Sequence, residues 1–261
     1  MTSPGVDPSA NRAEDRAEDQ YDVDVLVVGG GQAALAVGYH LQRARRRGAT
    51  ALTFALLDAG ARPGGAWTGG WESLRLFSPA TISSLPGWPM PAWPGAGAPS
   101  GEHVRAYLAA YEERYALPVH RPVRALGTRA TTNGFTVTTD HGVWRCRVLV
   151  SATGSTGRPF VPSYPGQAAF RGRQLHSAAY RGPDDLEDRT VLVVGGGNSG
   201  AQVAADLNRR RLGRTVWVTR RPPRFLPDHL TGGPSSSGPH GTCVRSRRAS
   251  RSRTRRTWAT S

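Results

Sequence analysis

Apolar runs and helix-forming stretches follow one another in a regular order near the start of the chain. An apolar run at residues 23–28 ends in glycine, residues 32–47 are rich in helix formers, and a second apolar run covers 53–57. Short apolar runs bounded by glycine are typical of buried parallel strands. This order predicts a strand, a helix and a second strand, which together form one βαβ unit.

The same order returns further along the chain. Apolar runs at 191–194 and 215–219 flank a helical stretch at 199–211, which predicts a second βαβ unit that ends after its second strand. From residue 231 to residue 261 the chain is almost all Ser, Arg, Gly, Pro and Thr, with no apolar period. This end is either a disordered basic tail or, as we prefer, a frameshifted or artificially ended reading frame, because an alternate frame of GC-rich DNA encodes mostly such residues.

Between the two units lies a stretch of mixed character. Residues 59–100 are rich in Gly and Pro and contain four tryptophans, so we expect an ordered segment that wraps around something flat. Residues 102–115 read as a helix, and the runs 135–139 and 143–150 read as a β-hairpin.

A glycine-rich loop follows the first predicted strand. Gly29 permits the tight turn, Gly31 lets the backbone approach a pyrophosphate at the helix N-terminus, and Ala34 allows close packing of helix and strand. Asp58 ends the second strand, where an acid would accept both ribose hydroxyls of FAD or NAD and disfavour a 2′-phosphate. This combination predicts a dinucleotide site.

A second pair of features follows Asp58 within ten residues. Gly65 stands in a paired-glycine turn that suits a backbone pressed against a phosphate or a flavin ring, and Trp67 offers an aromatic face beside it. Taken alone the turn would be ordinary, but its position favours cofactor binding.

The loop after the third apolar run has the full G-x-G-x-x-G spacing at Gly195, Gly197 and Gly200. Arg220 and Arg221 stand where an acid would otherwise end the next strand. Guanidinium groups there would pair with a 2′-phosphate, which selects NADPH over NADH. The alternative is a solvated basic turn in a chain rich in Arg. Two such loops predict an α/β fold with two Rossmann-like dinucleotide-binding domains, the second incomplete.

Composition narrows the classes of function. The chain has 34 basic residues, all Arg, and a net charge of +15, which would ordinarily raise nucleic-acid binding. Seven of these Arg lie after residue 228 without any acid, and only one aromatic residue accompanies them, so nucleic-acid recognition is not expected.

The two cysteines form neither a CxxC pair nor a metal pattern. No apolar run is long enough for a membrane span and no secretory signal is present, so we expect a cytoplasmic protein.

A longer motif lies between the two glycine-rich loops. Phe170, Gly172, His176 and Tyr180 have the spacing F-x-G-x-x-x-H-x-x-x-Y, and G-x-G-N-S-G begins 15 residues after Tyr180. Together they closely resemble the fingerprint of class B flavin-dependent monooxygenases, the flavin-containing monooxygenase family. Tyr180 favours the N- and S-oxygenating and auxin-forming branches over Baeyer–Villiger enzymes, which have Trp there. The sequences at residues 71–79 and 85–91 are most similar to a bacterial subgroup often encoded in arsenic-resistance operons.

The resemblance implies two cofactors and a reaction. Members use NADPH to reduce FAD, capture O₂ as a flavin C4a-hydroperoxide and transfer one oxygen to a soft nucleophile or a carbonyl of a small molecule. The cofactor carries the chemistry and the protein supplies orientation and a dry pocket, so no acid–base residue is named. By resemblance, FAD is bound by Gly29, Gly31, Asp58, Gly65 and Trp67. NADPH is bound by Gly195, Gly197, Asn198, Ser199, Gly200 and Arg220.

The resemblance also sets the expected domains. We expect a disordered leader at 1–20, an FAD-binding domain at 21–160, an NADPH-binding domain at 161–228 and the basic tail at 229–261, with the His176 loop linking the two domains. Two departures are visible. Residues 77–79 lack an Asn that many members place near the flavin, and nothing after residue 228 matches the segment that completes the FAD domain in the family. The short chain is therefore expected to bind cofactor weakly or to fold poorly.

Two other functions remain open. A disulfide reductase with two dinucleotides would explain both loops, but the absence of CxxC argues against it. A non-catalytic nucleotide-binding relic, or a protein that binds nucleic acid through its Arg-rich tail, would explain the tail instead. The sequence does not define the oligomeric state.

Overall fold

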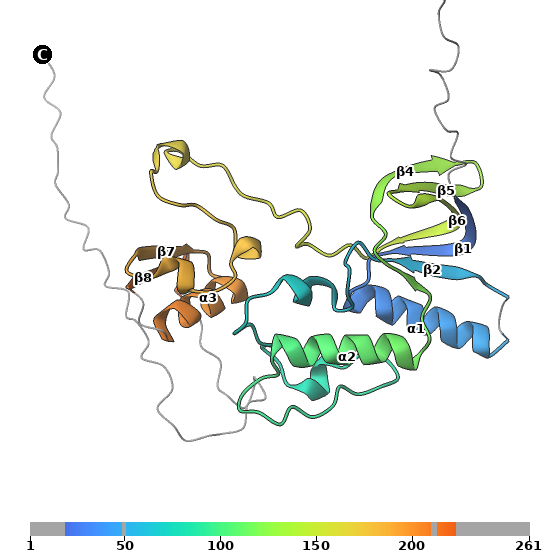
Figure 1. Ribbon diagram of the computed structural model, residues 1–261, viewed down its shortest axis with the longest axis horizontal. Coiled ribbons are helices and arrows are strands. Elements are labelled where there is room, and N and C mark those ends of the chain that lie inside the picture. Colours follow the sequence, from blue (N-terminus) through green and yellow to red (C-terminus); the bar gives the residue numbers. More distant parts are fainter. Residues whose placement is uncertain (1–18, 49–50, 210–212, 223–261) are drawn as a thin grey trace, which may run out of the picture. The chain divides into compact units, whose positions relative to one another are not determined.

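The computed structural model describes residues 19–48, 51–209 and 213–222 (Figure 1). These residues divide into two compact units, one that ends at Gly182 and one that begins at Pro183. The predicted boundary lay 22 residues earlier, between 160 and 161. Of the predicted leader only residues 19 and 20 are described, and β1 begins at Gln20. The predicted tail at 229–261 lies outside the described residues.

The first unit is built on a six-stranded mixed sheet with the strand order β3-β2-β1-β6-β5-β4. β3, β2, β1 and β6 are parallel. β5 pairs antiparallel with β6 on one side and with the edge strand β4 on the other. The predicted strands and the predicted hairpin are confirmed. The strands are β1 (Gln20–Val28), β2 (Phe54–Leu57), β3 (Val119–His120), β4 (Ala125–Thr131), β5 (Gly134–Thr139) and β6 (Gly142–Ser151).

Two helices cover one face of this sheet. Figure 1 shows α1 (Gln32–Arg46) and α2 (Gly101–Arg114) together on the same side of the strands. Val27 of β1 and Leu56 of β2 point into a core that also contains Leu35 of α1 and Leu108 of α2, all four without exposed surface. Alternate strand residues point to the opposite face, where Leu26 packs with apolar residues of β5 and β6. The sheet is therefore buried on both faces at β1, as a parallel strand requires.

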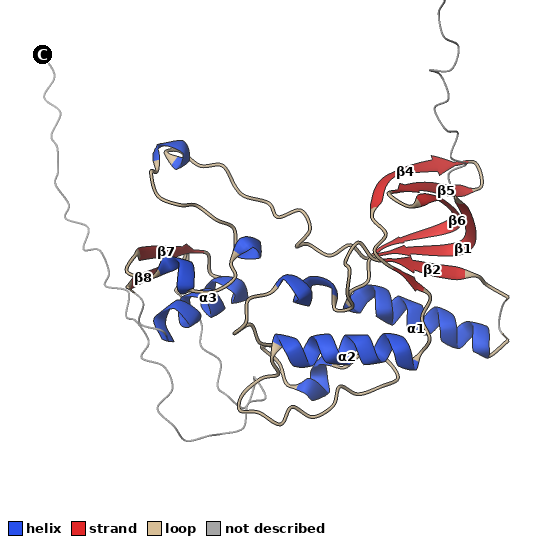
Figure 2. Ribbon diagram, in the orientation of Figure 1, coloured by secondary structure: helices blue, strands red, loops and turns tan. Residues whose placement is uncertain are grey.

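The segment between β2 and α2 is ordered with little regular structure, as Figure 2 shows. It contains only two short 3₁₀ turns, η1 (Gly65–Gly69) and η2 (Ala80–Ser83). Two tyrosines of α2 hold it. The Tyr111 hydroxyl donates to the Pro86 carbonyl at 2.6 Å, and the Tyr107 hydroxyl donates to the Trp88 carbonyl at 2.7 Å while accepting from the Leu85 amide. The predicted Trp-rich wrap is thus a layer laid on α2.

The second unit is small. It contains β7 (Thr190–Val194), α3 (Asn198–Arg209) and β8 (Arg214–Val218), with β7 and β8 paired in parallel. The second predicted βαβ unit is therefore confirmed. Three further 3₁₀ turns lie between β6 and β7: η3 (Gln167–Ala169), η4 (Ser177–Ala179) and η5 (Asp184–Leu186). Among the described residues no helix is both long enough and apolar enough to cross a membrane.

The contacts of Tyr107 lead to a prediction about the wrap. Tyr107→Phe would leave the partly buried Leu85 amide and Trp88 carbonyl without their partner, which costs about 1–3 kcal/mol of unfolding free energy. We expect urea denaturation to report this loss and limited proteolysis to cut faster within residues 80–95. Tyr21→Phe is the matched control, because the Tyr21 hydroxyl lies at the surface. Equal stability of the two variants would contradict the assigned role of Tyr107.

Candidate functional site

Three strand ends of the first unit meet at the first glycine loop (residues 29–31). The Gly29 amide donates to the Leu57 carbonyl of β2 at 2.8 Å, and the Ala152 amide after β6 donates to the Val28 carbonyl at 2.8 Å. Gly29 has φ +131°, and a Cβ there would collide with the Ala152 carbonyl. A Cβ on Gly30 would collide with the Asp58 carboxylate. Glycine is therefore required at both positions by the protein itself.

Gly31 differs from its two neighbours. Its φ is −89°, and a Cβ built on it would touch only the Gly65 Cα, at an ordinary 3.8 Å. It is the N-cap of α1, yet no side chain caps the helix and no acid stands in its first turn. The first amides of a helix lack intrahelical partners and carry the positive end of its dipole. The loop thus leaves the first amides of α1 without a side-chain cap, and no close contact within the protein explains why Gly31 is glycine.

The predicted turn after Asp58 lies against this loop. Gly65 has φ +52°, and a Cβ on it would stand 2.7 Å from the Gly31 Cα. The Trp67 indole N–H donates to the Gln32 side-chain oxygen at 3.2 Å, and Arg105 of α2 donates to the Trp67 carbonyl at 3.2 Å. The structure therefore brings together Gly29, Gly31, Gly65 and Trp67. Ala34, in the first turn of α1, is fully buried in the core.

Asp58 lies at the end of β2, where the sequence places it, and is only 7% exposed. It forms an ion pair with Arg121 at 3.0 Å, and Arg121 also pairs with Glu112 of α2 at 2.6 Å. Burial alone would lower the pKa of Arg121, but the hydrogen bonds and charges of Glu112 and Asp58 outweigh it and raise that pKa. The guanidinium therefore stays charged between the two carboxylates.

The second glycine loop (residues 195–197) begins α3 in the second unit. Gly195 has φ +134°, and its carbonyl accepts from the Trp217 indole N–H at 2.7 Å. A Cβ on Gly200 would stand 2.5 Å from that carbonyl, so this glycine allows the close approach of helix and loop. A Cβ on Gly197 would meet nothing within 4 Å. No acid stands in the first turn of α3, which starts at Asn198 and Ser199.

The two arginines after β8 are both exposed. The Thr219 hydroxyl between them and the strand donates to the Arg221 carbonyl at 2.7 Å, which fixes the backbone of this turn. Thr219 also packs beside Gly196, 3.6 Å from where a Cβ would stand. Arg220 and Arg221 therefore lie in a turn that begins directly beside the second glycine loop.

The residues of the longer motif each have a local contact. Gly172 lies beneath the Phe170 ring, where a Cβ would stand 2.5 Å from the ring edge. The His176 Nδ1 accepts the Ala178 amide at 3.1 Å and so caps η4. Tyr180 is buried and meets Trp71 edge to face, with ring centroids 5.5 Å apart. All four residues lie in the first unit, just before the division at Gly182.

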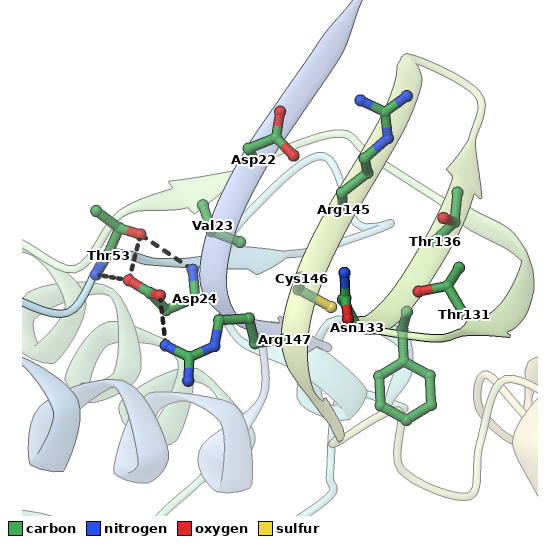
Figure 3. Close-up of a pocket in the computed structure, with 11 residues that line it drawn as sticks. Asp22, Val23, Asp24, Thr53, Thr131, Asn133, Thr136, Arg145, Cys146 and Arg147 are labelled. Carbon is green, nitrogen blue, oxygen red and sulfur yellow. Dashed lines mark hydrogen bonds and ion pairs between the residues drawn. The ribbon is translucent and has the colours of Figure 1, made fainter.

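A depression of about 560 Å³ opens elsewhere in the first unit, beside the first half of β1 (Figure 3). None of the predicted site residues lines it. Asp24 there accepts from the Thr53 amide and hydroxyl, both at 2.9 Å, and contacts Arg147. The Thr53 amide is the main cause that lowers the Asp24 pKa. Burial raises the pKa of the neighbouring Cys146 thiol, which keeps it protonated at neutral pH. These charges satisfy one another, and we assign the depression no role.

Sequence reasoning missed three residues at these loops. Arg121 follows a strand of only two residues, too short for a periodic signal. Ala152 begins a run of small residues directly after β6, and this position at the end of a parallel strand was the available signal. Trp217 read as one more apolar strand residue, because nothing in a single sequence shows that its N–H reaches Gly195. Among the described residues no group of three His, Cys, Asp or Glu side chains is arranged to hold a metal ion.

The geometry agrees with comparison to known proteins. A family model described as pyridine nucleotide-disulphide oxidoreductase matches residues 26–228, from near the end of β1 to beyond β8. The chain belongs to this family. Both glycine loops, and all the residues predicted to bind a cofactor, lie inside the range that this family model matches.

Individual relatives add detail. The oxidoreductase named CzcO-like of Geobacillus kaustophilus is 35% identical over 192 residues, which cover 74% of this chain and 53% of the relative. The indole-3-pyruvate monooxygenase YUCCA4 of Oryza sativa subsp. japonica is 30% identical over 230 residues, covering 79% of this chain and 49% of the relative. This family member thus spans about half the length of the curated relatives it matches.

A solved structure shows the same likeness. The flavin-containing monooxygenase of Stenotrophomonas maltophilia is 45% identical, with a TM-score of 0.74 over 80% of this chain and 61% of that one. These comparisons confirm the predicted resemblance to flavin-containing monooxygenases and the α/β fold. The subgroup of arsenic-resistance operons stays a prediction.

Gly65 gives a test of the loop packing. Gly65→Ala would strain a left-handed residue and press its Cβ on the Gly31 Cα. Gly97→Ala is the matched control, because Gly97 also has a positive φ, +70°, but a Cβ there meets nothing within 4 Å. The control should cost about 1–2 kcal/mol for the backbone alone. We expect Gly65→Ala to cost clearly more in urea unfolding, and equal costs would contradict the close contact between Gly65 and Gly31.

Proposed function

We propose that this protein is an FAD- and NADPH-dependent monooxygenase that transfers one oxygen from O₂ to a small-molecule substrate. One observation carries the proposal. Gly31 and Gly197 begin helices with uncapped or acid-free first turns, and a Cβ on either would meet no protein atom closer than 3.8 Å. Glycine is explained at both positions by the approach of a pyrophosphate. The resemblance to flavin-containing monooxygenases then favours this reaction among those that use two dinucleotides.

The first loop is proposed to hold FAD. Residues 29–31 and the start of α1 would face the pyrophosphate, Asp58 would bind the adenine ribose, and Gly65 and Trp67 would line the cofactor beside them. When bound, the flavin supplies electron transfer and oxygen activation. The chain's own contribution is to fix the cofactor between three strand ends and to keep the Asp58 carboxylate in place through Arg121.

The second loop is proposed to hold NADPH. The start of α3 would face the pyrophosphate, and Arg220 and Arg221 would pair with the 2′-phosphate. Both arginines are exposed and neither makes an ion pair among the described residues, so their charge is available. The lone described cysteine, Cys146, is buried, which favours a monooxygenase over a disulfide reductase.

The visible spectrum and two glycine variants test the cofactor assignment together. The purified protein, supplied with FAD, should absorb near 450 nm and bleach when NADPH is added. Gly31→Ala should weaken FAD binding at least about tenfold because its methyl group occupies the pyrophosphate site, while the unfolding free energy changes by less than about 0.5 kcal/mol. Gly197→Ala should leave FAD binding unchanged and slow the bleaching by NADPH.

Each variant is the control for the other, because both add one methyl group at the start of a helix. A protein that takes up no FAD would contradict the proposed function. Loss of FAD binding in Gly197→Ala would show that the two loops do not serve separate nucleotides.

The preference for NADPH rests on the arginines after β8. Replacing Arg220 and Arg221 with Ala should raise the Kd of NADPH about tenfold or more, since each charge-assisted bond to phosphate contributes roughly 1.5–3 kcal/mol. The Kd of NADH, which lacks the 2′-phosphate, should change less than about threefold. Arg214→Ala is the matched control, because Arg214 is an exposed arginine at the opposite end of β8. Equal losses for NADPH and NADH would overturn the 2′-phosphate role.

A further inference from the structure

The carboxylate oxygens of Asp58 already accept several hydrogen bonds from within the protein, which limits how many a bound ribose could add. Arg121 donates to its Oδ2 twice, from Nε at 3.1 Å and from Nη2 at 3.0 Å. The Gly60 amide donates to Oδ1 at 3.0 Å. A carboxylate offers about four acceptor positions, two on each oxygen. Three are therefore filled within the protein, and the position that stays open is on Oδ1.

Arg121 is itself firmly held. Its Nη1 and Nη2 donate to the two carboxylate oxygens of Glu112, at 2.6 and 2.9 Å, in the two-bond geometry that only a guanidinium provides. The side chains of Arg121 and Glu112 are 13% and 16% exposed. The fork thus ties the end of β2 to α2 and has little freedom to swing away.

The backbone places Arg121 beside Asp58 before any side chain acts. The Asp58 amide donates to the His120 carbonyl at 2.9 Å, and the Val123 amide donates to the Asp58 carbonyl at 2.8 Å. Residues 120–123 therefore wrap around Asp58 on one side, and Gly30 of the first glycine loop touches the carboxylate on another. The first set of contacts fixes the Asp58 backbone, and the second places its carboxylate beside the first glycine loop.

We propose that Arg121, anchored by Glu112, is a positioning residue that reserves Oδ2 of Asp58 and leaves Oδ1 to bind a single hydroxyl of the adenine ribose of FAD. This inference rests on the proposed FAD site and refines it. The sequence alone suggests that the acid accepts both ribose hydroxyls, whereas the contacts of Arg121 leave an acceptor for one. Affinity should then depend unequally on the 2′- and 3′-hydroxyls.

Competition with FAD tests this directly. ADP, 2′-deoxy-ADP and 3′-deoxy-ADP would be titrated against the FAD complex of the full chain, with displacement read from the recovery of flavin fluorescence. In the unmodified protein one deoxy analogue should bind about tenfold more weakly than ADP and the other less than about threefold, because one charge-assisted bond is lost in only one case. Equal weakening of both analogues would overturn the inference.

Three variants separate positioning from general stability. Arg121→Lys keeps the charge but cannot bond both carboxylates as a fork, so the two analogues should bind within about twofold of each other. Glu112→Gln should partly reduce the difference in affinity between the two analogues, because the glutamine keeps an acceptor for Arg121 but loses the negative charge. If Arg121→Lys does not fold, Glu112→Gln serves as the test in its place. Arg124→Lys, an exposed arginine three residues away, should keep the full inequality.

The outcomes distinguish this inference from the proposed function. If the unmodified protein takes up no FAD, the proposed function fails. If it binds FAD and both Arg121→Lys and Glu112→Gln retain the full inequality, the proposed function stands and Arg121 is not the positioning residue. A loss of inequality with unchanged urea midpoints supports the proposal, because a merely structural ion pair would change the midpoint and leave the ratio alone.

Discussion

The absence of side chains at Gly29 and Gly30 is the constraint on which the first unit depends. Gly29 lies against the segment after β6 and Gly30 against the acid after β2, so a Cβ on either would collide with that neighbour. The ends of three parallel strands can converge only because no Cβ separates them. The same convergence places the start of α1, where we propose that FAD binds, beyond the carboxyl ends of the strands, which is where ligands of open parallel sheets bind.

The structure distinguishes the glycines that the fold requires from those that it does not, a distinction that the spacing of the motif does not reveal. Gly29, Gly30 and Gly65 are required by positive φ values or by contacts within the protein, so their presence would follow from the fold even without a ligand. Gly31 and Gly197 have neither reason. The glycine-rich motif therefore contains both glycines that the fold requires and glycines that it does not. Only the second kind points to a bound nucleotide.

The strands β1, β2, β7 and β8 and their order could be predicted, because each contains an apolar run bounded by glycine or a charged residue. β4 could not, since its residues are largely exposed and pair through backbone bonds that leave no hydrophobic period. Much of the site could be predicted as residue types at a strand end. The partners could not: Arg121 and Trp217 reach Asp58 and Gly195 across 63 and 22 residues, and such contacts are set by the folded chain.

The two loops differ in how far the protein encloses them, and this difference suits the two proposed roles. The first is surrounded by β2, β6, the turn at Gly65 and the ion pairs of Arg121, so a nucleotide bound there would be held by several fixed elements at once. The second rests on one βαβ unit, with Gly197 facing open space and Arg220 and Arg221 exposed. A site held mainly by exposed charges releases its ligand more readily than an enclosed one, because water competes for each contact. A resident flavin at the first loop and an exchanging NADPH at the second are the assignment that this asymmetry favours.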